Sequence, residues 1–199
     1  MELILASQSP RRRELMTDAG YSFRVLVSSA DETLPESTPP AEGVRILAER
    51  KAKAVESSLP PAILQSAPVY VIGADTLVEL NGVPLGKPKD EAEATAMLSA
   101  LSGARHRVVT GVAVVVGGKV FSGTETTTVT FRPLTDGEIA EYVASGEPMD
   151  KAGAYGIQAG ADRFVKHVDG EVDNVIGLPR KLLAKLLREA GYEPGKETK

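Results

Sequence analysis

A short apolar run followed almost at once by a helix start is the feature that most constrains how this chain folds. Residues 3–5 read Leu-Ile-Leu, as expected for a buried strand, and Ser9-Pro10 follow closely. Serine is a preferred N-cap, and proline in the first helical position loses no hydrogen bond. We therefore predict a strand that leads into a helix over residues 10–19, with Gly20 as its C-terminal stop.

The remainder of the chain alternates strands with helices and then turns to longer paired strands. Further helices are predicted over residues 41–57, 90–101, 135–145 and 179–190, and strands over 23–27, 69–72, 108–116, 119–121 and 124–131. Gly117-Gly118 is typical of a hairpin turn. The fold class predicted is α/β, a mixed twisted sheet flanked by helices, in a single domain over residues 1–199 that can divide into two lobes.

Composition excludes several classes of protein. The chain has no cysteine, which excludes disulfides, thiolate catalysis and cysteine-bound zinc. Its net charge of −4 gives no basic field for nucleic acid, so we expect no nucleic-acid partner. No apolar run fits a signal peptide or a membrane span, so we expect a cytoplasmic protein with no membrane partner. His106 and His167 lack metal-ligand spacing, and we expect structural roles for both.

Three arginines lie in the first turn of the first predicted helix, where the helix dipole disfavours cations. An anion placed there would offset this cost, and free N–H groups, serine hydroxyls and guanidinium groups together suit a phosphate. At 100° per residue, Arg12 shares its side of the helix with Leu15 and Met16 and leans inward, while Arg11 borders this face and Arg13 points to water. The alternative is three solvated surface arginines.

A lysine also lies on the apolar face of the helix over residues 41–57. Lys51 falls between Val44, Ala48 and Val55, whereas Lys53 projects to the opposite side. A cation in that place must either extend its ammonium to water or meet an anion. A phosphate site shared with Arg12 and Lys87 is the simpler explanation.

Carboxylates follow two of the predicted strands. Asp75 comes just after the apolar strand 69–72, where ligands gather in open α/β sheets. It could bind a divalent cation, deprotonate a water molecule, or only cap a turn. Asp31 and Glu32 could supply a second carboxylate for a magnesium site, and Lys87 lies close in sequence, in Gly86-Lys87-Pro88.

The segment over residues 147–160 is rich in glycine and is typical of a loop that closes over a ligand. Within it, Gln158 offers both a donor and an acceptor and could bind the imide edge of uracil or thymine. An ordinary polar loop residue is the alternative.

Taken in order, these segments resemble the Maf family of nucleoside triphosphate pyrophosphatases through nearly the whole chain. The resemblance is carried by Ser7-Gln8-Ser9-Pro10-Arg11-Arg12, Asp31-Glu32, Arg50-Lys51-Ala52, Gly73-Ala74-Asp75-Thr76, Gly86-Lys87-Pro88, Leu101-Ser102-Gly103, the segment from Asp150 to Gln158, and the segment from Asn174 to Pro179. No single motif is specific, but the ordered set is.

The resemblance implies hydrolysis of a nucleoside triphosphate to a monophosphate and pyrophosphate. It implies a fold like that of inosine triphosphate pyrophosphatases, with two lobes around a cleft, and a homodimer. By the same resemblance Asp75 is the proton acceptor, and Glu32 helps it hold Mg²⁺ or Mn²⁺. The phosphates are held by Arg12, Lys51 and Lys87, with a hydrogen bond from Ser7.

Residues that mark substrate choice in the family correspond here to Arg11, Thr76 and Gln158, a set similar to that of the branch acting on dTTP and UTP. Two alternatives stay open. One keeps the chemistry and changes the base, toward 7-methyl-GTP or another modified nucleotide. The other is a non-enzymatic nucleotide-binding regulator of septum formation, which has no need of Asp75.

Overall fold

The computed structural model describes residues 1–194. The strands are β1 (Glu2–Leu5), β2 (Arg24–Val25), β3 (Val69–Leu80), β4 (Val83–Leu85), β5 (Arg105–Val116), β6 (Lys119–Phe131) and β7 (Val165–Asp169). The α-helices are α1 (Pro10–Asp18), α2 (Pro40–Ser58), α3 (Pro61–Ser66), α4 (Glu91–Leu101), α5 (Asp136–Ala144), α6 (Val172–Ile176) and α7 (Arg180–Glu189). Three short 3-10 helices, Glu147–Asp150, Ala152–Ala154 and Asp162–Phe164, follow α5.

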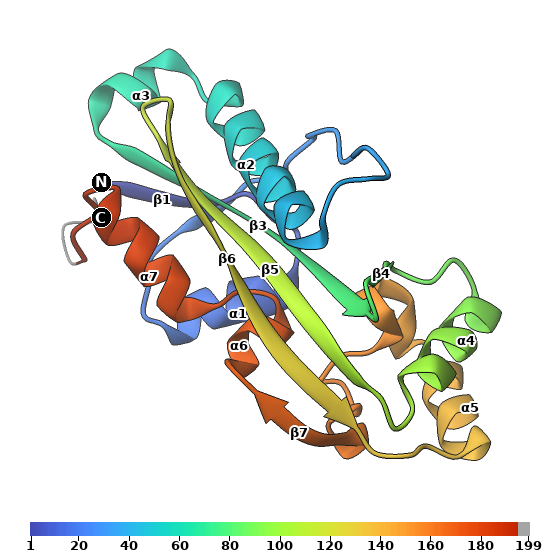
Figure 1. Ribbon diagram of the computed structural model, residues 1–199. Helices are drawn as coiled ribbons and strands as arrows, with labels where there is room; N and C mark the ends of the chain where they lie inside the picture. The colour runs from blue at the N-terminus through green and yellow to red at the C-terminus, as the bar shows by residue number, and fades with distance from the viewer. Residues whose placement is uncertain (195–199) are drawn as a thin grey trace. The chain divides into compact units, whose positions relative to one another are not determined.

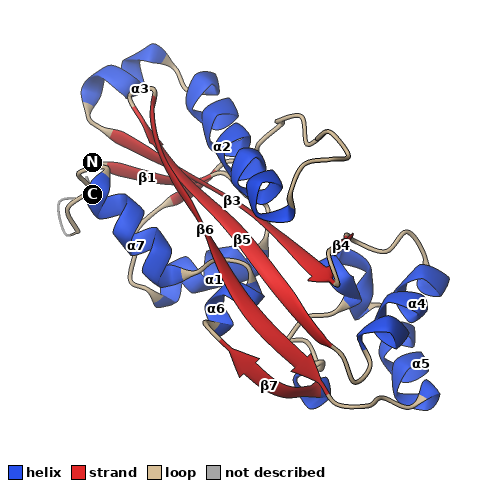
Figure 2. Ribbon diagram, in the orientation of Figure 1, coloured by secondary structure: helices blue, strands red, loops and turns tan. Residues whose placement is uncertain are grey.

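The strands form one mixed sheet in the order β2-β1-β3-β5-β6-β7, with β4 paired to β3 (Figure 2). β1 runs parallel to both β2 and β3, while β4 and β7 pair antiparallel with β3 and β6. Helices flank the strands, so the predicted α/β class with a mixed sheet is confirmed. The cleft between two lobes stays a prediction.

The chain divides into two compact units. Unit 1 holds Met1–Asp75, Thr110–Glu125 and the segment from Gly177 onward. Unit 2 holds Thr76–Val109 and Thr126–Ile176. The long strands β3, β5 and β6 contribute residues to both units. That the chain forms one domain stays a prediction.

In unit 1, helices cover both faces of the strands because successive strand residues point to opposite faces (Figure 1). Val71 packs in one core with Ala48 and Ala52 of α2. The preceding residue, Tyr70, points the other way: its hydroxyl donates to the carbonyl of Gly191, just after α7, at 3.1 Å. Helices α2 and α7 therefore lie on opposite faces of β3.

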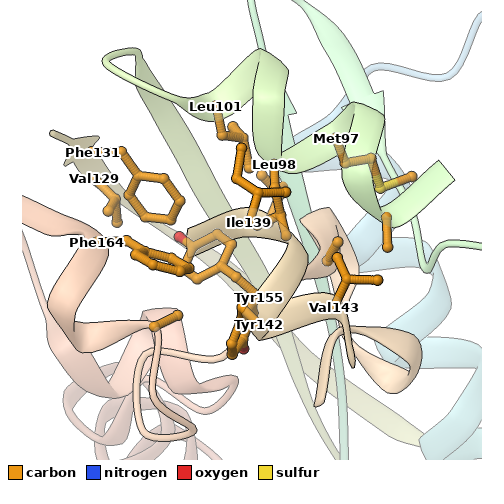
Figure 3. Packing of buried hydrophobic residues seen from close by; sticks show 14 of the residues in the cluster. Met97, Leu98, Leu101, Val129, Phe131, Ile139, Tyr142, Val143, Tyr155 and Phe164 are labelled. Atoms are coloured by element: carbon orange, nitrogen blue, oxygen red, sulfur yellow. The ribbon is translucent and has the colours of Figure 1, made fainter. Parts of the chain in front are cut away.

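In unit 2, the core joins α4 and α5 to the end of β6 and to the segment that follows α5 (Figure 3). Phe131 and Tyr155 meet edge to face, with ring centroids 4.8 Å apart, and Tyr142 meets Phe164 in the same way at 5.3 Å. α5 begins with a complete capping box, in which Thr135 and Glu138 exchange hydrogen bonds. This core holds Ala152, Ala154 and Tyr155 against α4 and α5.

Every predicted helix and strand corresponds to an element of the structure, although β2 is shorter and β3 longer than predicted, and four short elements were not predicted. The predicted hairpin is confirmed, with Gly117 and Gly118 both at positive φ in its turn. The two predicted strands 119–121 and 124–131 are one strand, β6. α3, α6, β4 and β7 have 3 to 6 residues each, too few to show a period, and were not predicted.

Across residues 1–194, no helix is both long enough and apolar enough to span a bilayer.

His106 generates a prediction about acid stability. Its ring is 1% exposed in the unit 2 core, its Nε2 lies 2.8 Å from the hydroxyl of Tyr155, and burial lowers its pKa from 6.5 to about 4. The unfolded chain takes up this proton below its ordinary pKa, while the folded chain resists it down to about pH 4. Stability should therefore fall by about 3 kcal/mol as the pH drops through this window.

Denaturant unfolding of the wild type and of His106→Gln at a series of pH values tests this. The substitution should flatten the pH dependence between about pH 6.5 and 4. An equally steep dependence in the variant would show that other groups cause it.

Candidate active site

The first turn of α1 has the cap that the sequence predicts. Ser9 is the N-cap, its side chain accepts from the backbone N–H of Arg12 at 3.4 Å, and Pro10 opens the helix. No acidic residue lies in that turn to offset the charge of the arginines. The helix N-terminus is therefore a positively charged surface built from backbone N–H groups and guanidinium groups.

Arg12 is oriented by two groups of unit 1. Its Nε donates to the carbonyl of Gly177 at 2.8 Å, and its Nη1 donates to the hydroxyl of Ser7 at 3.3 Å. Arg12 is half-buried and Arg13 is exposed, as the helical wheel predicts. Ser7 is 9% exposed, and its hydroxyl also accepts from the backbone N–H of Ser9. The guanidinium is thus held in a fixed direction.

Lys51 lies between two carboxylates. Its ammonium is 2.6 Å from Oδ1 of Asp75 and 3.2 Å from Oε1 of Glu32. The Lys51 side chain is 13% exposed and that of Asp75 17%, whereas Glu32 is 62% exposed. The prediction that Lys51 faces inward and Lys53 outward is confirmed. The ammonium meets an anion and does not extend to water.

A close approach of α2 to the sheet makes this pairing possible. A Cβ at Gly73 of β3 would lie 2.1 Å from the carbonyl oxygen of Ala48, and one at Gly111 of β5 would lie 2.3 Å from that of Val44. The helix backbone therefore rests directly on two glycines. Asp75 follows Gly73 by two residues and shares its face of β3, where Lys51 of α2 reaches it.

Asp75 lies within a strand, so the predicted strand end at residue 72 is wrong. β1 pairs with β3 only as far as Leu5 and Ile72, and the backbone N–H of Ala6 makes one further bond to Ile72. β3 nevertheless continues to Leu80, and its last three residues pair with β4. Asp75 is therefore found just past the point where β1 leaves the sheet, with one side of β3 uncovered by that strand.

The loop that carries Glu32 is shaped by its neighbours. Asp31 uses Oδ1 to accept from the backbone N–H of Thr33 at 2.9 Å, and this bond lowers its pKa. Arg50 donates to the carbonyls of Asp31 and Thr33, on either side of Glu32. Asp31 thus shapes the turn, and Glu32 meets Lys51. That Arg50 holds the backbone on either side of Glu32 was not predicted, because nothing in the sequence around Arg50 indicates this contact.

Arg12 interacts electrostatically with the two carboxylates that meet Lys51. Burial lowers the pKa of Arg12 below its ordinary value, and the carboxylates of Asp75 and Glu32 act in the opposite direction. The adjacent Arg11, itself half-buried, lowers it further. Unit 1 therefore brings Ser7, Arg11, Arg12, Glu32, Lys51 and Asp75 into one electrostatic neighbourhood.

The remaining predicted site residues belong to unit 2. Thr76 follows Asp75 in β3 and is half-buried. Lys87 is exposed in the loop after β4, and the preceding carbonyl, of Gly86, accepts from the backbone N–H of Gly153 at 3.0 Å. Gln158 is exposed in a turn in which the backbone N–H of Ala159 donates to Gly156 at 2.9 Å. Their roles stay predictions.

For a divalent cation, the donors of unit 1 fit in type. Asp75 and Glu32 already converge on one positive group, the ammonium of Lys51, and Mg²⁺ takes one or two carboxylates with substrate phosphates. Within residues 1–194 no cluster of three or more histidine, aspartate or glutamate side chains could hold a metal. A cation here would take its other ligands from substrate or water.

Comparisons with known proteins agree in family. The model of the family described as Maf-like protein matches residues 2–190. A protein of Pelotomaculum thermopropionicum is 48% identical over 96% of this chain and 97% of its own length, and one of Geobacillus sp. is 47% identical over 96% and 99%. One of Colwellia psychrerythraea is 46% identical over 100% of this chain and 92% of its own. All three relatives are named dTTP/UTP pyrophosphatase.

A solved structure, the Staphylococcus aureus Ham1 protein, matches at 16% identity with a TM-score of 0.42, covering 96% of this chain and 100% of that chain.

The contact at Gly73 predicts a large effect of one methyl group. Gly73→Ala should lower the free energy of unfolding by about 1–3 kcal/mol or more, because backbone atoms of α2 occupy the space of the new Cβ. Gly137→Ala is the matched control, since nothing lies within 4 Å of a Cβ built there. Denaturant unfolding measures both, and wild-type stability in Gly73→Ala would refute the close contact.

Proposed function

Because the chain belongs to the Maf family, we propose that it is a nucleoside triphosphate pyrophosphatase that acts on dTTP and UTP. Relatives that share 46–48% of its residues over nearly the full length of both chains have that activity as their name. The enzyme releases the nucleoside monophosphate and pyrophosphate.

The observation that carries the proposal is the cluster of unit 1. Two cations from different helices, Arg12 and Lys51, share a neighbourhood with the carboxylate of Asp75. Phosphoryl transfer depends mainly on positioning and on compensation of negative charge. A triphosphate would supply the anion that the first turn of α1 lacks, and Ser7 adds a hydroxyl donor next to Arg12. Lys87 is assigned a further phosphate contact by the family resemblance.

In the proposed reaction, water attacks the α-phosphorus. A bond forms from the water oxygen to that phosphorus, the bond from the phosphorus to the α–β bridging oxygen breaks, and pyrophosphate leaves with the electron pair. Asp75 accepts the proton of the water. Arg12 and Lys51 stabilise the charge that develops on the phosphate oxygens.

Asp75 and Glu32 would hold Mg²⁺ or Mn²⁺, since the two carboxylates already converge on one cation. Such an ion, when bound, withdraws electron density from the phosphate and orients the triphosphate. This cofactor rests on the family resemblance and on the donor types.

The pyrimidine preference is assigned to Arg11, Thr76 and Gln158. The amide of Gln158 complements the N–H and carbonyl of an imide, which uracil and thymine share. A homodimer in the cytoplasm, with no nucleic-acid or membrane partner, completes the proposal and rests on the resemblance and on composition.

Pyrophosphate release from UTP, dTTP, CTP, GTP and 7-methyl-GTP, with magnesium and with excess chelator, tests the function. UTP and dTTP should be hydrolysed fastest, and the chelator should abolish turnover. Preference for 7-methyl-GTP would show that the enzyme catalyses the same reaction on a nucleotide with another base. Nucleotide binding without any hydrolysis would support the regulator instead.

Asp75→Asn tests the proton acceptor. The amide cannot take up a proton, so kcat should fall about 10²–10⁴-fold while UTP still binds. Asp18→Asn, at an exposed aspartate of α1, is the matched control and should retain full activity. Unchanged turnover in Asp75→Asn would remove Asp75 from its role.

A further inference from the structure

Lys151 is a buried lysine of unit 2 to which the proposed mechanism gives no task. Its side chain is 7% exposed, and its ammonium has three acceptors. These are the carbonyl of Glu147 at 2.5 Å, the carboxylate of Glu147 at 2.9 Å, and the carboxylate of Asp150 at 2.7 Å. These three hydrogen bonds from a charged donor fix the end of a side chain that is otherwise flexible.

The aliphatic part of this lysine lies against Gly156. A Cβ at Gly156 would be 2.6 Å from Cε and 2.7 Å from Cδ of Lys151. With its ammonium held by three acceptors, the lysine side chain cannot swing away freely. The aliphatic part of Lys151 therefore packs directly against the backbone of Gly156.

Gly156 in turn begins the turn that carries Gln158. Its carbonyl accepts from the backbone N–H of Ala159, so residues 157 and 158 are the central positions of the turn. Its own N–H donates to the hydroxyl of Tyr142 at 3.1 Å, and the Tyr142 ring packs on Phe164 of the core. Gly156 is thus fixed on one side by Tyr142 and on the other by Lys151.

From these contacts we infer that Lys151 is a positioning residue for Gln158, and so for the choice of base. The inference rests on the proposed function, in which Gln158 binds the imide edge. Gln158 is itself exposed, and the backbone of its turn determines where its Cα–Cβ bond starts. Lys151 sets that backbone through Gly156, and Gly156 must lack a side chain for the contact to exist.

Two substitutions test the contact between Lys151 and Gly156, one at each residue. Lys151→Met keeps an unbranched side chain against Gly156 and removes the ammonium. Gly156→Ala keeps the ammonium and forces either the lysine side chain or the turn to move. Glu147 and Asp150 are 47% and 62% exposed, so water can solvate them in Lys151→Met. Lys166→Met and Gly137→Ala are the matched controls, at an exposed lysine and at a glycine with open space around it.

The ratio of kcat/KM for UTP to that for GTP measures base selection and cancels contacts to the triphosphate, which both nucleotides share. Each of the two variants should lower this ratio about tenfold, through KM for UTP with kcat little changed, because a base contact acts equally on the ground and transition states. The controls should keep the wild-type ratio. Thermal unfolding verifies that each variant is folded, and if one fails to fold the other still decides.

A double-mutant cycle with Gln158→Ala separates positioning from general damage. If Lys151 acts through Gln158, then Lys151→Met should change the ratio little once Gln158 is already alanine. Independent, multiplying effects of the two substitutions would overturn the inference.

Amide hydrogen exchange of residues 156–160 gives a readout that needs no activity. Lys151→Met should speed exchange there and leave α4 as it is in the wild type. If the wild type does not hydrolyse UTP, the proposed function fails, and exchange still tests the contact. If it does hydrolyse UTP, but ratio and exchange are both unchanged in Lys151→Met and Gly156→Ala, the positioning role alone is refuted.

Discussion

The direct contact of α2 with two glycines of the sheet is the constraint on which the rest of unit 1 depends. Helices usually lie farther from a sheet because side chains separate the two backbones. Here Gly73 and Gly111 remove those side chains, and the helix backbone comes within van der Waals contact of the strands. This distance lets the ammonium of Lys51 reach Asp75, and Arg50, next to Lys51, fixes the carbonyls that flank Glu32. The two glycines that allow close packing therefore also determine which charged groups meet.

Two lysines with little exposed surface, Lys51 and Lys151, have different surroundings in the two units. Lys51 faces two carboxylates: the ammonium could exchange them for phosphate oxygens, and the carboxylates could take a metal ion in its place, so this pairing suits a site where ligands come and go. Lys151 has a backbone carbonyl among its acceptors and a glycine along its side chain, and these groups suit a permanent contact. We thus propose that the same residue type supplies charge for the reaction at Lys51 and rigidity for a loop at Lys151.

Periodicity along the chain was sufficient to predict which way Arg12 and Lys51 point, because a helix of two or more turns repeats its faces. It was not sufficient for Asp75, whose strand continues to Leu80, beyond the last residue that pairs with β1. Nor could it assign the carbonyl of Gly177 to Arg12, or separate Asp31 from Glu32, since these depend on contacts between distant or competing groups. Periodicity cannot reveal contacts between residues far apart in the sequence. The resemblance carried by the ordered motifs indicated some of those contacts.

The most direct test of this account is an experimental structure with magnesium and a non-hydrolysable UTP analogue. The account predicts that triphosphate oxygens lie within hydrogen-bond distance of the guanidinium of Arg12 and the ammonium of Lys51. It also predicts that the α-phosphorus faces the carboxylate of Asp75. A triphosphate bound elsewhere, with Lys51 still paired to Asp75 and no phosphate near Arg12, would contradict it.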